Sequence, residues 1–194
     1  MFEFLGCVIQ ADIPQEQMAA IVRTESSVRQ YAIGVVGGEL NRQPANADEA
    51  VAAVEMLKTS GKNYSVGLAQ VNQVNFKHYG LNASNMFDIC TNLNVGAKIL
   101  ETCFTQHQDW QKAYSCYYSG NPTTGFAHGY VKKVSGNLNK PIPTAVLPPK
   151  ISIDKQPIVF VAKKDSTQNK KANSRVSVRM SLTQRRLSSS LFTN

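Results

Sequence analysis

The sequence lacks several features that define large protein classes. No apolar run is long enough to span a bilayer, so we expect no transmembrane segment. The chain has 3 histidines, and its 4 cysteines show no closely paired spacing, so we expect no metal site of the zinc type. Its first residues lack the basic region and the long apolar run of a secretory signal peptide. We therefore expect that this chain carries no signal peptide.

Excess charge is also missing from most of the chain. Residues 1–140 contain 11 Lys/Arg and 11 Asp/Glu, whereas residues 141–194 contain 10 Lys/Arg and 2 Asp/Glu. The whole net charge of +8 therefore belongs to the C-terminal segment. Aromatic residues are few in that segment (Phe160 and Phe192), which disfavours base stacking, so we expect no nucleic-acid partner.

The cysteines leave the redox compartment open. An even number in a domain of this size permits two disulfides and an oxidising compartment. Four buried thiols in a reducing compartment are the alternative. Four cysteines allow three pairings, and the sequence does not choose among them. The residues concerned are Cys7, Cys90, Cys103 and Cys116.

Helical patterns dominate the first 138 residues. A capping pattern with proline in the first turn predicts a helix from residue 12 to residue 28 or 30. A second capping pattern and an apolar stripe predict a helix over residues 46–61. Apolar spacing predicts two more helices, over residues 93–104 and 110–118. Strand signals are sparse, apart from an extended or turn segment at 34–38, so the predicted fold class is mostly α (α+β).

The composition changes after residue 138. Four prolines between residues 141 and 149 indicate a linker. The apolar run at residues 158–162 is either a strand or a docking segment. The remainder is rich in Ser, Lys and Arg and cannot bury enough apolar surface to fold alone. We therefore predict a domain at residues 1–138, followed by a linker and a largely disordered basic tail at 139–194.

Glu25 is the first candidate for a catalytic residue. Met18, Ile21 and Val22 mark the apolar side of the predicted first helix, and Glu25 falls at the next step of their spacing. Burial disfavours the charged form of a carboxylate and raises its pKa, which suits a general acid near neutral pH. An ordinary partnered or rim carboxylate is the alternative interpretation.

Three separated motifs carry the functional signal. They are ESS at residues 25–27, SVGLAQVN at 65–72 and CYYSGN at 116–121. Each is weak alone, but their order and spacing resemble the lytic transglycosylase domain with the goose-lysozyme-like fold. That family has a Glu-Ser pair, then Gly-Leu-Met-Gln-x-Asn, then Ala-Tyr-Asn-x-Gly. The similarity covers about residues 7–134 and is greatest to the specialised transglycosylases of type IV secretion and conjugation systems.

The resemblance implies roles for individual residues. Glu25 is the expected catalytic acid and base, and Tyr117 is expected to bond near it and orient it. Ser26 would hold the glutamate or contact sugar, unless its hydroxyl bonds back to the helix. Tyr130 is expected to offer a stacking face to a sugar ring. The side chains expected to line the cleft and bind the substrate are Ser65, Gln70 and Asn72.

None of the three motifs contains a second acid, and the resemblance implies that one carboxylate suffices. Most glycosidases use two carboxylates. The resemblance implies that the acetamido group of the substrate stabilises the cationic carbon and that the 6-hydroxyl then closes a 1,6-anhydro ring. It also implies that no cofactor is needed. The other acids lie in a loop or on solvated helix faces: Glu39, Asp48, Glu49, Glu55, Asp88, Glu101 and Asp109.

The resemblance also implies a cellular context. The expected substrate is peptidoglycan, opened locally in the periplasm or cell envelope so that a secretion apparatus can assemble. A hydrolytic lysozyme of the goose type and a glycan-binding module without turnover are the alternatives. The basic tail is expected to dock on a component of the secretion apparatus or on anionic wall polymer; an arm for an anionic membrane surface is another interpretation.

Two residues depart from the family pattern. Ala69 stands where the family has methionine, which removes apolar bulk that packing could absorb. Tyr118 stands where the family has asparagine after the tyrosine of the third motif, which could change sugar contacts at the cleft.

Overall fold

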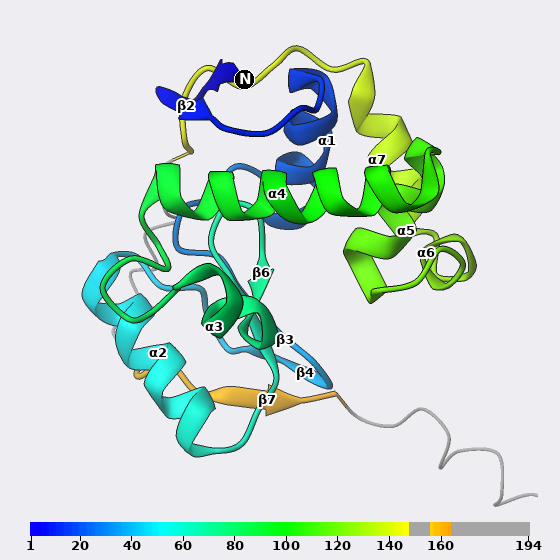
Figure 1. Cartoon of the computed structure of the whole chain (residues 1–194). Coiled ribbons are helices and arrows are strands. Elements are labelled where there is room, and N and C mark those ends of the chain that lie inside the picture. The colour runs from blue at the N-terminus through cyan, green and yellow to red at the C-terminus, as the bar shows by residue number, and fades with distance from the viewer. Residues whose placement is uncertain (148–155, 164–194) are drawn as a thin grey trace, which may run out of the picture. The chain divides into compact units, whose positions relative to one another are not determined.

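The computed structural model describes residues 1–147 and 156–163 (Figure 1). Within these residues the fold is mostly helical with two small sheets, which confirms the predicted α+β class. The compact part of the chain reaches Lys163, beyond the predicted domain end at residue 138. The rest of the predicted tail, at 148–155 and 164–194, lies outside the described residues.

The helices and strands of the described residues follow one another along a single compact unit. The α-helices are α1 (Gln15–Ser26), α2 (Ala47–Thr59), α3 (Phe76–Tyr79), α4 (Ile89–His107), α5 (Trp110–Ser119), α6 (Thr124–Ala127) and α7 (Tyr130–Leu138), with a 3-10 turn, η1 (Gln73–Asn75), before α3. The strands are β1 (Phe2–Phe4), β2 (Cys7–Ile9), β3 (Ile33–Val35), β4 (Gly38–Leu40), β5 (Tyr64–Val66), β6 (Val71–Asn72) and β7 (Phe160–Ala162).

The four predicted helices are present, with differences at their ends. Helix α1 begins after Pro14, which adopts an extended conformation, and not at residue 12. It ends at Ser26 because Ser27 and Val28 both have positive φ, 53° and 63°, which an α-helix cannot contain. Helix α2 begins as predicted, with the side chain of Asn46 accepting a bond of 2.9 Å from the backbone N–H of Glu49.

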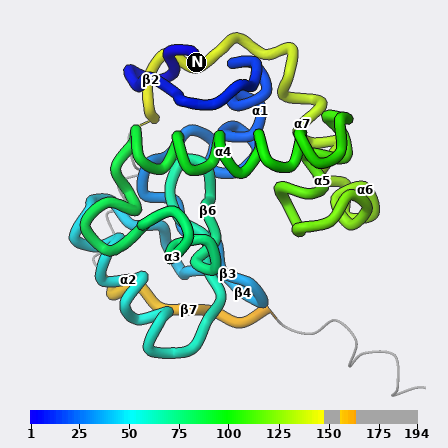
Figure 2. The backbone as a smooth tube through the Cα atoms, viewed as in Figure 1, coloured from blue at the N-terminus to red at the C-terminus, as the bar shows by residue number. Residues whose placement is uncertain are grey.

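Helix α4 is the longest described helix and runs across the middle of the unit (Figure 1). It packs against α5 on one side and against β2 on another, and α1 packs against α7. Figure 2 shows the same path, with α1, α5 and α7 gathered near α4 and with α2 and the larger sheet below it. The buried residues form one apolar cluster among α1, α4, α5 and α7 and a second one between α2 and the sheet.

The larger sheet is antiparallel with the strand order β6-β5-β3-β4-β7. The segment predicted to be extended at 34–38 forms the β3–β4 hairpin. The apolar run predicted to be a strand or a docking segment adds the edge strand β7, with Phe160 opposite Leu40. A Cβ at Gly38 would lie 2.3 Å from the ring of Phe160, so glycine is required for this close approach. Residues beyond the predicted linker therefore complete the sheet.

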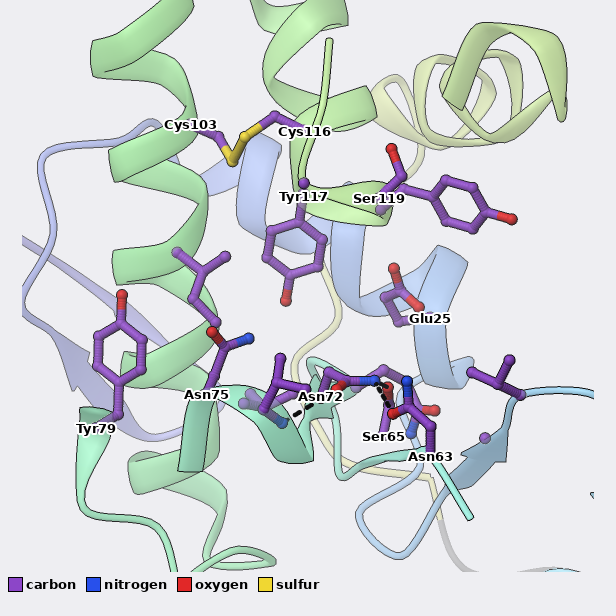
Figure 3. A pocket seen from close by; sticks show the side chains of 18 of the residues that line it. Glu25, Asn63, Ser65, Asn72, Asn75, Tyr79, Cys103, Cys116, Tyr117 and Ser119 are labelled. Carbon is purple, nitrogen blue, oxygen red and sulfur yellow. Dashed lines mark hydrogen bonds between the residues drawn. A yellow bond between two sulfur atoms is a disulfide. The ribbon is translucent and has the colours of Figure 1, made fainter. Parts of the chain in front are cut away.

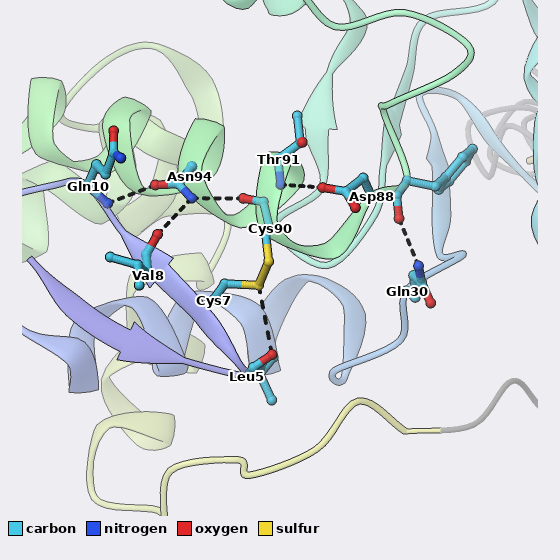
Figure 4. Close-up of a disulfide and its surroundings, with 10 residues drawn as sticks. Leu5, Cys7, Val8, Gln10, Gln30, Asp88, Cys90, Thr91 and Asn94 are labelled. Atoms are coloured by element: carbon cyan, nitrogen blue, oxygen red, sulfur yellow. Dashed lines mark hydrogen bonds between the residues drawn. A yellow bond between two sulfur atoms is a disulfide. The ribbon is translucent and has the colours of Figure 1, made fainter.

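Two disulfides join secondary elements to α4, and the described residues contain no free cysteine. Cys7–Cys90 ties the β1–β2 hairpin to the start of α4 (Figure 4). Cys103–Cys116 ties α4 to α5. The cysteines therefore form two disulfides and are not four buried thiols.

A buried asparagine fixes the second motif to α4. The side-chain oxygen of Asn92 accepts a bond of 2.9 Å from the backbone N–H of Ala69, and its amide donates to the carbonyls of Val66 and Met86 at 3.0 Å. Its side-chain polar groups are therefore paired although the residue is 1% exposed. Gly67 has φ +79°, and a Cβ there would lie 2.3 Å from the Asn92 amide. Asn92 and Gly67 together hold the loop against the helix.

Replacing Asn92 with alanine should therefore destabilise the protein far more than the same change at Asn94. Both side chains make three hydrogen bonds, and Figure 4 shows those of Asn94, but Asn92 is buried whereas Asn94 is partly exposed. Each buried group left unpaired costs about 1–3 kcal/mol, whereas water replaces a partner lost near the surface. We expect a loss of about 4 kcal/mol in the free energy of unfolding for Asn92→Ala and about 1 kcal/mol for Asn94→Ala. Urea unfolding with both disulfides intact measures the difference, and equal losses would contradict it.

Candidate active site

Glu25 lies in the last turn of α1 and faces a cleft of about 700 Å³. The residues that precede it on the same side of the helix, among them Met18, Ile21 and Val22, are fully buried, so the helix presents its apolar face to the core. The spacing that singled out Glu25 therefore places its carboxylate where the core meets the cleft. Among the described residues, Glu25 is the single carboxylate that lines this cleft (Figure 3).

The environment of Glu25 favours its protonated form. Burial raises the pKa of its carboxyl from 4.5 to about 7, and a hydrogen bond from the hydroxyl of Tyr130 to Oε1 partly opposes this rise. Burial dominates because taking a carboxylate out of water disfavours its charge. A carboxyl with this pKa can both donate and accept a proton near neutral pH.

Tyr130, and not Tyr117, donates the hydrogen bond to Glu25. The hydroxyl of Tyr117 instead donates to the backbone oxygen of Ala69 at 2.6 Å. Tyr117 does lie in the same cleft as Glu25 (Figure 3), and the negative charge of Glu25 together with burial raises the pKa of the phenol well above its usual value. The hydrogen bond to Glu25 that was expected of Tyr117 is thus made by Tyr130, while Tyr117 joins α5 to the second motif.

The expected stacking role of Tyr130 is contradicted by its burial. Tyr130 is only 6% exposed, and the ring of Tyr118 stacks on it with 4.6 Å between the centroids and 21° between the planes. No open face of Tyr130 is left for a sugar. Sequence reasoning missed the hydroxyl role of Tyr130 because α1 and α7 are separated by about a hundred residues, and nothing local predicts which phenol reaches Glu25.

Ser26 is placed differently from both functional expectations. It is buried, and its hydroxyl donates to the backbone oxygen of Val22 at 3.1 Å, one turn earlier in α1. It does not line the cleft that contains Glu25. The structure agrees with the alternative interpretation, in which the hydroxyl of Ser26 bonds back to its own helix.

The sheet side of the cleft is polar and uncharged. The amide of Asn72 donates to Oγ of Ser65 at 3.2 Å and to Oδ1 of Asn63 at 2.9 Å, as the dashed lines in Figure 3 mark. Ser65 and Asn72 lie opposite each other on β5 and β6. The two strands therefore place two of the three expected substrate-binding residues on one surface, together with Asn63, which sequence reasoning did not identify.

Gln70 lines the same cleft but is held by the backbone. Its amide donates to the carbonyls of Ala32 at 2.9 Å and Gly67 at 3.0 Å. It has φ +48°, and a Cβ at Gly34 would lie 2.7 Å from its side-chain oxygen. Gln70 therefore links the second motif to the β3 end of the sheet, and Gly34 is needed to admit its side chain.

Four of the other acidic residues have structural partners, and among the described residues no acid but Glu25 lines the cleft. Glu49 binds Arg42 in a pair of hydrogen bonds, and these lower the pKa of its carboxyl to about 2. Asp88 caps α4 and Asp109 caps α5. Glu101 accepts a bond of 2.6 Å from the backbone N–H of Asp12. None of these carboxylates can serve as a second acid beside Glu25.

The described residues also contain no group of three or more His, Cys, Asp or Glu side chains that could hold a metal ion. No helix within 1–147 or 156–163 is both long and apolar enough to cross a membrane.

The three sequence motifs thus meet at one cleft, with Glu25 from the first, Ser65, Gln70 and Asn72 from the second, and Tyr117 from the third. The profile of the Transglycosylase SLT domain matches residues 9–139. The chain belongs to the SLT transglycosylase family. This confirms the family that the motifs resembled.

Relatives of the SLT chain include proteins of secretion systems. The chain is 44% identical to the type IV secretion system protein virB1 of Brucella suis biovar 1 (strain 1330), over 70% of this chain and 63% of that protein. It is 31% identical to protein virB1 of Agrobacterium fabrum (strain C58 / ATCC 33970), over 69% of this chain and 57% of that protein. The chain therefore spans about three fifths of the length of these curated relatives. No solved structure matches the chain significantly.

The two departures from the SLT pattern have different consequences. Ala69 is fully buried against Gly96 of α4, where a Cβ on the glycine would lie 2.4 Å from that of Ala69. The helix thus approaches the small side chain of Ala69 closely. Tyr118 remains exposed at the cleft and covers Tyr130.

The raised pKa of Glu25 makes a prediction about stability that does not depend on activity. Its carboxyl ionises near pH 4.5 in the unfolded chain and near pH 7 in the folded one. The unfolded state therefore binds fewer protons between these values, and the native protein loses stability as the pH rises through this window. Because a pKa difference of one corresponds to about 1.4 kcal/mol, the loss attributable to Glu25 is about 3 kcal/mol.

The measurement is urea unfolding of the wild type and Glu25→Gln at pH 4 and pH 8. The variant has no proton to lose at this position, so its stability relative to the wild type should increase by about 3 kcal/mol from pH 4 to pH 8. A constant difference between the two proteins would show that Glu25 is not held in its protonated form by the fold.

Proposed function

We propose that this SLT chain cleaves the β-1,4 bond between MurNAc and GlcNAc in peptidoglycan without consuming water, leaving 1,6-anhydro-MurNAc ends. The observation that carries the proposal is a cleft lined by a single carboxylate whose pKa is raised to about 7. Membership of the family implies transglycosylase activity. The cleft matches a reaction that needs one group to act first as acid and then as base.

The proposed first step is bond cleavage. Protonated Glu25 donates its proton to the glycosidic oxygen, the bond from that oxygen to C1 of MurNAc breaks, and the GlcNAc alcohol leaves. C1 becomes cationic, and the acetamido oxygen of the same sugar stabilises it by adding to C1. Glu25 is then a carboxylate, and the hydroxyl of Tyr130 stabilises its charge.

The second step closes the anhydro ring. Glu25 takes the proton from the 6-hydroxyl of MurNAc while that oxygen attacks C1 and displaces the acetamido oxygen. Glu25 thereby regains a proton in place of the one that it gave to the leaving group, and no water is consumed. Ser65, Gln70 and Asn72 present hydroxyl and amide groups along the sheet side of the cleft, where they suit the acetamido and hydroxyl groups of the glycan.

The cellular setting of the reaction is also a proposal. The names of the relatives place those proteins in type IV secretion, and two disulfides fit an oxidising compartment outside the cytoplasm. We infer that the chain acts in the periplasm or cell envelope, where it opens peptidoglycan locally for assembly of a secretion or conjugation apparatus.

The decisive experiment is mass spectrometry of the fragments released from peptidoglycan by the wild type and by Glu25→Gln. We expect anhydro-ended muropeptides from the wild type and at least about 100-fold less product from the variant, because it cannot transfer the proton. Glu16→Gln is the matched control, since it changes an exposed acid on the same helix.

Each other outcome has a definite meaning. Reducing ends in place of anhydro ends would indicate a hydrolytic lysozyme of the goose type. Binding to peptidoglycan without any product would indicate a glycan-binding module. Equal activity of Glu25→Gln and Glu16→Gln would remove Glu25 from the mechanism.

The basic segment after Lys163 is proposed to dock the enzyme on anionic wall polymer or on a component of the secretion apparatus. Residues 164–194 contain 7 Lys/Arg and 1 Asp. A chain that ends at Lys163 keeps β7, whereas an end at residue 140 would remove it from the sheet.

We therefore expect the chain ending at Lys163 to retain turnover on soluble glycan fragments and to bind isolated wall sacculi more weakly than the full chain. The difference should shrink as salt rises, because exposed charges are screened over about 8 Å at physiological ionic strength. Sedimentation with sacculi at low and high salt measures it. Equal binding by the two chains at low salt would exclude docking on the wall through this segment.

A further inference from the structure

Tyr118 is an exposed aromatic residue at the edge of the catalytic cleft. It is 45% exposed, whereas Tyr130 beneath it is 6% exposed. One face of its ring stacks on Tyr130, and its side chain lines the cleft that contains Glu25. The ring therefore has one covered face and remains accessible to solvent on the cleft side.

The orientation of Tyr118 is fixed from a second direction. Its hydroxyl lies 3.2 Å from Nδ1 of His128, and the two rings meet edge to face with 5.8 Å between their centroids. An exposed side chain normally keeps rotamer freedom, which it must lose when a ligand binds. Tyr118 has already lost that freedom to Tyr130 and His128, so a ligand can use its outer face at low entropic cost.

A fixed and exposed aromatic face suits one class of ligand in particular. The ring carries negative charge on its face and a large apolar surface. A pyranose ring has a face of C–H bonds, which are weakly positive and apolar, while its hydroxyl groups point outward in the ring plane. Such a sugar can therefore stack on Tyr118 while its polar substituents reach the amides and hydroxyls across the cleft.

We propose that Tyr118 is a sugar-stacking residue of the cleft and, through Tyr130, a positioning residue for Glu25. The proposal rests on the proposed function, since the sugar would belong to the glycan strand that is cleaved. The outer face of the ring binds the sugar, and the inner face holds Tyr130 where its hydroxyl reaches the carboxylate.

The positioning role of Tyr118 follows from its contact with Tyr130, because the inner face of its ring covers that residue. Without the Tyr118 ring, water would reach Tyr130 and the Tyr130–Glu25 hydrogen bond. Among the described residues, the cleft also contains the phenols of Tyr117 from α5 and Tyr79 from α3, and His128 lies beyond Tyr118. No basic side chain of the described residues lines the cleft, so loss of burial is the main effect to expect on Glu25.

Three variants separate the two roles. Tyr118→Phe keeps the ring and removes the hydroxyl, Tyr118→Leu keeps apolar bulk without a ring, and Tyr118→Asn restores the residue of the family pattern. Phe126→Leu is the matched control, because Phe126 is 46% exposed on α6 and does not line the cleft.

The first measurement is the Kd of a soluble GlcNAc oligomer, by calorimetry, with each variant placed in the Glu25→Gln protein so that nothing is cleaved. We expect binding about 5-fold weaker for the leucine and asparagine variants, which is the size of one aromatic stacking contact. Tyr118→Phe should recover most of the affinity, and Phe126→Leu should bind as Glu25→Gln alone does. Equal affinity for Tyr118→Leu and Tyr118→Phe would overturn the stacking role.

The second measurement is the pH dependence of kcat/KM on peptidoglycan fragments, with Glu25 intact. Activity requires protonated Glu25, so it falls as the pH rises through the pKa of that residue. Exposure of the Tyr130–Glu25 pair in Tyr118→Asn should move this fall about one pH unit lower, because burial is what raises the pKa. Tyr118→Phe should restore the profile, and an unchanged profile in Tyr118→Asn would overturn the positioning role.

The outcomes also distinguish this proposal from the proposed function. A wild type that yields no cleavage product, combined with weaker binding in Tyr118→Leu, would refute the transglycosylase proposal and support the stacking role. Anhydro products combined with unchanged binding in Tyr118→Leu would refute the stacking role alone.

Discussion

The central constraint on the site is that the carboxyl group of Glu25 is held largely out of water. Glu25 lies where the apolar face of α1 reaches the cleft, and α7 covers it with the hydroxyl of Tyr130. A buried carboxylate without partners would be costly, and a fully paired one would stay ionised and could not give up a proton. Burial with one phenol donor is intermediate between these cases and leaves the pKa of Glu25 at about 7.

Keeping that arrangement requires a rigid support, which α4 provides. The Cys7–Cys90 disulfide attaches the N-terminal hairpin to the start of the helix, and Cys103–Cys116 attaches α5 near its end. Between them, Asn92 holds the second motif through three buried hydrogen bonds. The second and third motifs are thus both attached to α4, whereas the first motif is carried by α1, which packs against α7.

Short sequence patterns predicted the features that depend on neighbouring residues alone, such as which side of a helix faces the core. The spacing of Met18, Ile21 and Val22 placed Glu25 on the core side of a helix, and the motifs predicted that it shares a cleft with Gln70 and Tyr117. Pairings over long sequence distances were not predictable. Which phenol bonds Glu25, which cysteines join, and that the strand at 160–162 completes the sheet depend on the packing of whole elements, which no short pattern encodes. The sequence left two roles open for Ser26, because a helix hydroxyl can bond either outward or back to its own chain, and the structure has the bond back to Val22.

A single carboxyl with a pKa near the working pH also explains why the cleft needs no second acid. An acid with a pKa far below neutral pH would be ionised and could not protonate the leaving oxygen. An acid with a pKa far above neutral pH would donate its proton too weakly. At a pKa of about 7, each change of protonation state costs Glu25 little free energy near neutral pH. The carboxyl group can therefore donate a proton to the glycosidic oxygen and accept another from the 6-hydroxyl within the same turnover. The proposed mechanism uses this property, because Glu25 takes its second proton from the sugar itself and no second carboxylate of the described residues lines the cleft.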